Sequence, residues 1–124
     1  GSDLTVVAYG ALIREVQRAM VKAKDMGISV ELIDLRTIYP IDKTTVIESI
    51  KKTGRLVVVT EGPGSFGVGA ELITIANEEA FLHLEAPPKR VSGFDTIVPL
   101  PKGEHHYIIS PDKILFEIEK TVKY

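Results

Sequence analysis

The sequence predicts an α/β fold of three layers, in which a mainly parallel sheet carries helices on both faces. Strand-like and helix-like segments alternate at short intervals along the chain, as they do in successive βαβ units. The run RLVVVT, from Arg55 to Thr60, is continuously apolar, which is typical of a parallel strand buried on both faces. With 124 residues and a hydrophobic fraction of 44%, the chain is expected to form one domain with its own core.

The first half of the chain is predicted to supply two strands and two helices. Leu4 to Tyr9 is rich in β-branched residues, and Ile28 to Asp34 is a second run of this kind. Pro40 favours an extended conformation of the residue before it, and Asp42 is expected to cap a helix that begins at Lys43. The other helix is indicated by apolar residues at helical spacing, namely Leu12, Val16, Ala19, Met20, Ala23 and Met26.

The second half continues the same alternation. A glycine-rich turn follows Thr60 and leads into a helix predicted from about Gly69 to His83. A strand is expected from Lys89 to Ser92, then a loop broken by prolines, then a last helix from Pro111 to about Val122. Ligands of such sheets bind at the carboxyl ends of the strands, where the glycine-rich turn is predicted to lie.

Composition excludes several classes of function. The net charge is −2, from 15 basic and 17 acidic residues, and no basic stripe would follow a phosphate backbone. No apolar run is long enough to cross a bilayer, so we expect neither a nucleic acid nor a membrane partner. The absence of cysteine excludes disulfides and thiolate metal sites. It also fits a reducing compartment.

The start of the chain indicates a domain taken from a longer polypeptide. Gly1 and Ser2 resemble the remnant of a cleaved affinity tag, and no methionine begins the sequence. Asp3 leads at once into the first predicted strand. Residues 3–124 are therefore expected to be a single domain of a larger subunit.

The stretch EGPGSFGVGAE has the G-x-G-x-x-G spacing of a dinucleotide-binding turn, but three residues argue against that use. Pro63 offers no N–H to a phosphate, and Glu71 in the first helical turn would repel one. The only acid at the right distance, Glu85, precedes the next strand instead of ending it. We interpret the stretch as a structural turn with positive φ angles that brings the helix close to the sheet, formed by Gly62, Gly64, Gly67 and Gly69. A free-standing nucleotide-binding module remains the alternative.

No other group of residues predicts a catalytic or metal site. His105 and His106 are adjacent, but neighbours in an extended stretch point to opposite sides, so a solvated loop is expected there. Asp34 and Arg36 are expected to form a structural ion pair. We find no combination of nucleophile, base and oxyanion donor, and we predict no catalytic, cofactor-binding or metal-binding residue in this chain.

The helix after the glycine-rich turn is apolar around most of its circumference. Such a helix is buried on two sides, and one of them belongs to the sheet of this domain. The other side is expected to contact a neighbouring domain or subunit. The alternative is that the helix is buried on both sides in the core of its own domain. The residues assigned to this interface are Leu72, Ile75 and Ala76.

Three segments give the chain a recognisable family pattern: DLRTIYPID from Asp34, KTGRLVVVTEGPGSFGVGAEL from Lys52, and LEAPPKRVSGFDTIVPLP from Leu84. They resemble the C-terminal domain of the beta subunit of thiamine-diphosphate-dependent 2-oxo acid dehydrogenases. These enzymes are the decarboxylating components of the pyruvate, branched-chain 2-oxo acid and acetoin complexes. Transketolase carries a similar last domain, so a transketolase-type enzyme is a further alternative.

The resemblance implies that the chemistry lies elsewhere in the parent enzyme. In the family, thiamine diphosphate and magnesium are held between the alpha subunit and the first domain of the beta subunit, by a G-D-G motif that this chain lacks. The fragment alone is therefore expected to be inactive. The resemblance also implies pairing with an alpha subunit and a second beta subunit in a heterotetramer. It further implies docking of the subunit-binding domain of the acyltransferase, for which the matching positions are Glu85 and the terminal carboxylate of Tyr124.

Overall fold

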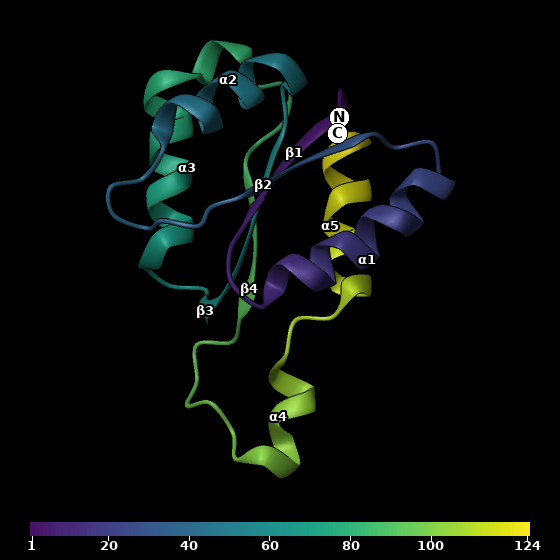
Figure 1. Ribbon diagram of the computed structural model, residues 1–124, viewed down its shortest axis with the longest axis vertical. Coiled ribbons are helices and arrows are strands. Elements are labelled where there is room, and N and C mark those ends of the chain that lie inside the picture. Colours follow the sequence, from purple (N-terminus) through teal and green to yellow (C-terminus); the bar gives the residue numbers. More distant parts are fainter.

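A four-stranded, fully parallel sheet lies between two layers of helices in the computed structural model, which describes residues 1–124 (Figure 1). The strands stand in the order β2-β1-β3-β4. Helices α1 and α5 cover one face of the sheet, and α2 and α3 cover the other. The strands are β1 (Leu4–Ala8), β2 (Val30–Asp34), β3 (Leu56–Pro63) and β4 (Lys89–Gly93). The helices are α1 (Leu12–Asp25), α2 (Lys43–Thr53), α3 (Gly67–Glu79), the short 3₁₀ helix η1 (Phe81–His83), α4 (Pro101–Tyr107) and α5 (Pro111–Val122).

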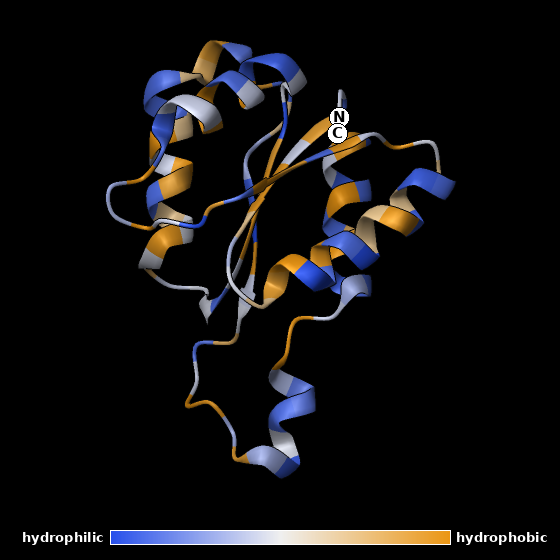
Figure 2. Ribbon diagram, in the orientation of Figure 1, coloured by the Kyte–Doolittle hydropathy of each residue, from blue (hydrophilic) through white to orange (hydrophobic).

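The two central strands form the middle of the core. Every residue of β1 is buried, and so are the first five residues of β3. Val6 is paired in register with Leu32 of β2 and with Val57 of β3. Its side chain packs with α1 and α5, whereas that of the next residue, Val7, packs with α2 and α3. The alternation of faces along a strand thus divides the apolar residues into two core clusters, one for each helical layer. Figure 2 shows hydrophobic residues on the central strands and on the helices that flank them.

The predicted fold class and the predicted starts of α2 and α5 are confirmed. The side chain of Asp42 accepts a hydrogen bond from the backbone N–H of Thr45 at 3.1 Å, which caps α2. Ser110 caps α5 in the same way, through the backbone N–H of Lys113 at 3.2 Å. Helix α2 ends at Thr53 and is followed by Gly54, whose φ of +69° is a conformation that favours glycine. No helix has both the length and the apolar character that crossing a membrane requires.

Two predictions were wrong: the end of the helix after the glycine-rich turn, and the loop expected before the last helix. Helix α3 ends at Glu79, four residues before His83, because Ala80 leaves the helical conformation with a φ of −136°. The tighter turn η1 follows, and it changes the direction of the side chains after Ala80. Within the segment expected to be a loop, residues Pro101–Tyr107 form the short helix α4, with Pro101 in its first turn.

A buried chain of hydroxyl groups joins α2 to the sheet. Thr5, which is fully buried, lies 2.7 Å from the hydroxyl oxygens of both Ser49 and Thr53. Ser49 in turn donates to Glu31 of β2 at 2.8 Å, and the ammonium of Lys52 donates to the same carboxylate. These bonds, that of Lys52 first, lower the pKa of Glu31 from its usual 4.5 to about 2. The network gives each buried hydroxyl group a partner, which burial requires.

The network predicts an acid-dependent loss of stability. Because folding lowers the pKa of Glu31, its contribution is complete above pH 4.5 and is lost as the pH falls towards 2. Glu31→Gln should lower the free energy of unfolding by about 1 kcal/mol at pH 7 and by much less near pH 2. Urea unfolding at both pH values measures this difference. Glu48→Gln, on an exposed carboxylate paired only with Lys51, is the control. Equal losses at both pH values would contradict the role of the carboxylate.

Candidate functional site

A groove of about 680 Å³ opens where the strands begin, at the amino edge of the sheet. The end of α3, η1, the connection to β4 and the C-terminal residue form its walls. Two apolar side chains of η1 stand out into solvent here, since Leu82 is 92% exposed and Phe81 is 64% exposed. We call this hollow the amino-edge groove; it is lined by Ile73, Asn77, Phe81, Leu82, Leu84, Glu85, Ala86, Pro87, Pro88 and Tyr124.

The structure thus brings Glu85 and Tyr124 into the same groove. A carboxylate oxygen of Glu85 lies 2.8 Å from Nη1 of Arg55. The backbone N–H of Glu85 donates to the carbonyl of Gly54 at 2.7 Å. A Cβ on Gly54 would lie only 2.9 Å from Cγ and Cδ of Glu85, so the absence of a side chain there leaves room for this carboxylate. The corner between α2 and β3 therefore holds the backbone of Glu85, while its paired side chain stays 61% exposed.

The predicted interface residues of α3 need a correction. Leu72, Ile75 and Ala76 are buried in the core cluster beneath α2 and α3, so they are not accessible to another molecule. The side of α3 that carries these three residues faces the sheet. The exposed apolar residues are instead Phe81 and Leu82, which the end of α3 and the turn η1 direct outwards.

The glycine-rich stretch is a strand end, a turn and a helix start. Gly62 still belongs to β3, and Gly69 lies inside α3 instead of in the turn. Among the four glycines only Gly67 has a positive φ, of +77°, and it follows Phe66. A Cβ on Gly69 would lie 3.1 Å from Cδ of Arg90, so the helix passes close to β4 at this point.

Phe66 is the most unusual residue of the turn. Its φ of 60° and ψ of −156° form a combination that glycine adopts almost alone. Phe66 is nevertheless 88% exposed, and Nη1 of Arg90 donates a hydrogen bond to its carbonyl oxygen at 3.4 Å. The turn is tied to the segment after β4 by Ser65, whose backbone N–H donates to Asp95 at 2.9 Å. The hydroxyl of Ser65 also donates to this carboxylate, and these bonds lower the pKa of Asp95.

The remaining candidates for chemistry do not form a site. His105 and His106 lie in α4 and not in the expected loop, with ring centroids 3.8 Å apart and both side chains exposed. No three histidine or carboxylate side chains gather in a way that could hold a metal ion. Asp34 and Arg36 form the expected ion pair, at 3.2 Å.

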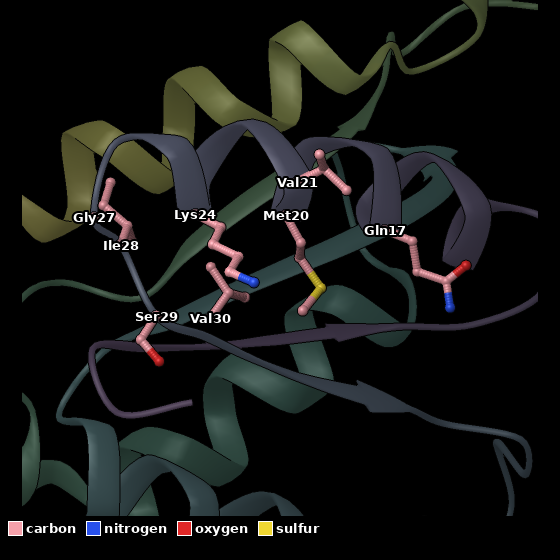
Figure 3. Close-up of a pocket in the computed structure, with 8 residues that line it drawn as sticks. All are labelled: Gln17, Met20, Val21, Lys24, Gly27, Ile28, Ser29 and Val30. Carbon is pink, nitrogen blue, oxygen red and sulfur yellow. The ribbon is translucent and has the colours of Figure 1, made fainter.

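A second hollow, of about 560 Å³, lies between α1 and the beginning of the edge strand β2. Figure 3 shows the side chains of Gln17, Met20, Val21 and Lys24 on α1 and that of Val30 on β2. Lys24 is the one charged residue among those that line it. The hollow therefore offers no pair of acid and base.

The strand order and the two helical layers define a doubly wound α/β domain. The chain belongs to the transketolase C-terminal domain family. The model of this family, described as "Transketolase, C-terminal domain", matches residues 1–114.

Among curated relatives, the chain is similar to beta subunits of the pyruvate dehydrogenase E1 component. It is 54% identical to that of Acholeplasma laidlawii over 123 residues, which are 99% of this chain and 38% of the relative. It is 43% identical to that of Leifsonia xyli over 124 residues, which are 100% of this chain and 37% of the relative. The chain thus spans less than two fifths of the length of these relatives.

Solved structures agree on the fold. A split-gene transketolase, described as an inactive beta4 tetramer, superposes with a TM-score of 0.84 at 23% identity, over 99% of this chain and 40% of that one. A 2-oxoglutarate:ferredoxin oxidoreductase from Magnetococcus marinus superposes with a TM-score of 0.68 at 12% identity, over 98% of this chain and 18% of that one. At these identities the likeness concerns the fold alone.

The conformation of Phe66 predicts the effect of two substitutions. Phe66→Gly and Phe66→Ala remove the same ring, but only glycine adopts the observed φ and ψ without strain. Phe66→Gly should therefore be more stable than Phe66→Ala by about 1 kcal/mol in urea unfolding. Equal stabilities would mean that the backbone of this turn is unstrained.

Proposed function

We propose that this chain is the C-terminal domain of the beta subunit of a pyruvate dehydrogenase E1 component. The observation that carries the proposal is the 54% identity to such a subunit over 99% of the chain. The parent enzyme decarboxylates pyruvate oxidatively and transfers the acyl group to a lipoyl group. It consists of alpha and beta subunits in a heterotetramer, in the cytoplasm or, in a eukaryote, in the mitochondrial matrix. The transketolase-type alternative has weaker support, because the similar transketolase is only 23% identical.

The residues of this chain do not fit thiamine diphosphate or magnesium. The sequence lacks the G-D-G motif that the family uses, and no three potential metal ligands lie together. The cofactors of the parent enzyme are therefore assigned to its other parts. This domain contributes to subunit assembly and to docking.

The activity is tested with the full-length subunit that contains this chain. Co-expressed with its alpha subunit and supplied with thiamine diphosphate and magnesium, it should decarboxylate pyruvate. The 124-residue chain alone should show no activity in the same assay. A full-length pair that binds the cofactor but turns over only sugar phosphates would contradict the dehydrogenase assignment and favour the transketolase-type alternative.

For docking, the amino-edge groove is the surface that we assign to the subunit-binding domain of the acyltransferase. Exposed apolar side chains, Phe81 and Leu82, adjoin a carboxylate that Arg55 and Gly54 hold in a fixed position. An apolar centre next to an anion suits a small partner domain that presents a guanidinium or ammonium group. A fixed carboxylate also loses little conformational entropy on binding.

The docking proposal predicts the effect of removing one charge. Glu85→Gln should weaken the binding of the subunit-binding domain about tenfold, as expected for the loss of one charge-assisted hydrogen bond. Titration calorimetry on the assembled E1 component measures the change. Glu78→Gln also removes one negative charge, but from an exposed residue outside the groove, so it should leave the affinity unchanged. Unaltered binding by Glu85→Gln would exclude Glu85 from the docking site.

A further inference from the structure

A third hollow, of about 630 Å³, opens at the carboxyl ends of β1 and β2, between the start of α1 and the loop after β2. The last residues of the two strands, Ala8 and Asp34, are paired in register. The backbone N–H of Leu35 donates to the carbonyl of Ala8 at 2.8 Å, so the residues that follow the two strands lie side by side. We call this the carboxyl-edge hollow; the side chains with polar atoms that line it are Tyr9, Arg14, Gln17, Asp34 and Arg36.

Two guanidinium groups give the hollow its positive charge. Arg14, in the first turn of α1, has no carboxylate partner, because the neighbouring Glu15 pairs with Arg18 at 2.9 Å. Arg36 donates from Nε to Asp34 at 3.2 Å. Since this bond uses Nε, both terminal nitrogen atoms of the Arg36 guanidinium remain free to donate to a second anion. Asp34 is the one carboxylate among the lining residues, so two positive charges and one negative charge leave one positive charge in excess.

Two uncharged side chains add hydrogen-bond donors. Burial, and to a smaller extent the charge of Glu61, raise the pKa of the half-buried Tyr9, so its hydroxyl stays protonated and can donate at neutral pH. Gln17 lies three residues after Arg14 on α1, which places the two side chains on the same face of the helix. Donors therefore reach the hollow from three segments: the end of β1, helix α1 and the loop after β2.

The donor set suits a phosphate group. A guanidinium binds phosphate through two parallel hydrogen bonds, and two such groups with an excess of positive charge suit a doubly charged anion. Pockets for small ligands usually measure about 300–1,000 Å³, so the hollow has room for more than the phosphate itself. Ile13 and Ile38 also line it and offer apolar contacts to an organic group. Ligands of parallel sheets bind at this end of the strands.

The charged lining favours a small soluble anion over a covering polypeptide segment. The side chain of Arg36 is 84% exposed, so water solvates its guanidinium. Burying the charge under a protein segment would cost free energy unless a matching anion accompanied it. We propose that the carboxyl-edge hollow binds the phosphate group of a small organic phosphate monoester, held by Arg14 and Arg36. The proposal uses only this chain and does not depend on the identity of the parent enzyme.

Titration calorimetry with phenyl phosphate tests the site, in the 124-residue chain and in the full-length polypeptide that contains it. Arg14→Gln and Arg36→Gln should each weaken binding at least tenfold, as expected for the loss of charge-assisted hydrogen bonds. Both residues are exposed, so neither change should lower the melting temperature of the unliganded protein. Arg18→Gln removes the same charge from α1 outside the hollow and should leave the affinity unchanged. Equal weakening by all three changes would indicate an adventitious ion only, and would overturn the proposal.

Two further comparisons test the chemical class and the occupant. Phenyl phosphate should bind at least threefold more tightly than inorganic phosphate, because its ring can contact Ile13 and Ile38, and equal affinities would contradict a monoester. Acetate should bind at least tenfold more weakly than inorganic phosphate, and equal binding would contradict a phosphate site. Binding by the 124-residue chain but not by the full-length polypeptide would show that another segment covers the hollow, which would also overturn the proposal.

Discussion

Burial of the two central strands on both faces is the constraint on which the rest of the structure depends. Because β1 and the first part of β3 have no exposed side chain, helices must cover both sides of the sheet. The alternation of side chains assigns one set of apolar residues to α1 and α5 and the other to α2 and α3. Thr5 is the polar member of β1, and its burial requires the hydroxyl partners Ser49 and Thr53. Because helices cover both faces of the sheet, the surfaces of the sheet that other molecules can reach lie at the two edges where the strands begin and end.

The two edges differ in their physical character. At the amino edge, the carboxylate of Glu85 is paired with Arg55 and lies beside exposed apolar residues. At the carboxyl ends of the strands, the exposed Phe66 lies in a turn and has a strained backbone conformation. Strain of this kind persists where the surroundings impose it, and it concentrates at functional positions. The two ends of the strands therefore differ, since one carries a paired carboxylate and the other an exposed aromatic ring.

Much of the fold could be predicted from the sequence, because local patterns determine it. The apolar run before Glu61 and the capping residues Asp42 and Ser110 mark elements that the structure contains. Helix α4 could not be predicted, since Pro101 and Gly103 in the sequence PKGEHHY are poor helix formers. The outward direction of Phe81 depends on the end of α3 at Glu79, and helical periodicity alone does not reveal that end. The ion pair between Arg55 and Glu85 joins residues 30 positions apart, so it could not be predicted from the sequence and is seen only in the folded chain.

The location of both chain ends at one edge has a consequence for the evolution of multidomain enzymes. A domain whose ends share one side can be joined to different neighbours by gene fusion, or separated by gene splitting, while its far side keeps the same geometry. Comparable domains make up 38% of one relative and 18% of another chain of the same fold. The same fold therefore occurs within polypeptides of very different length.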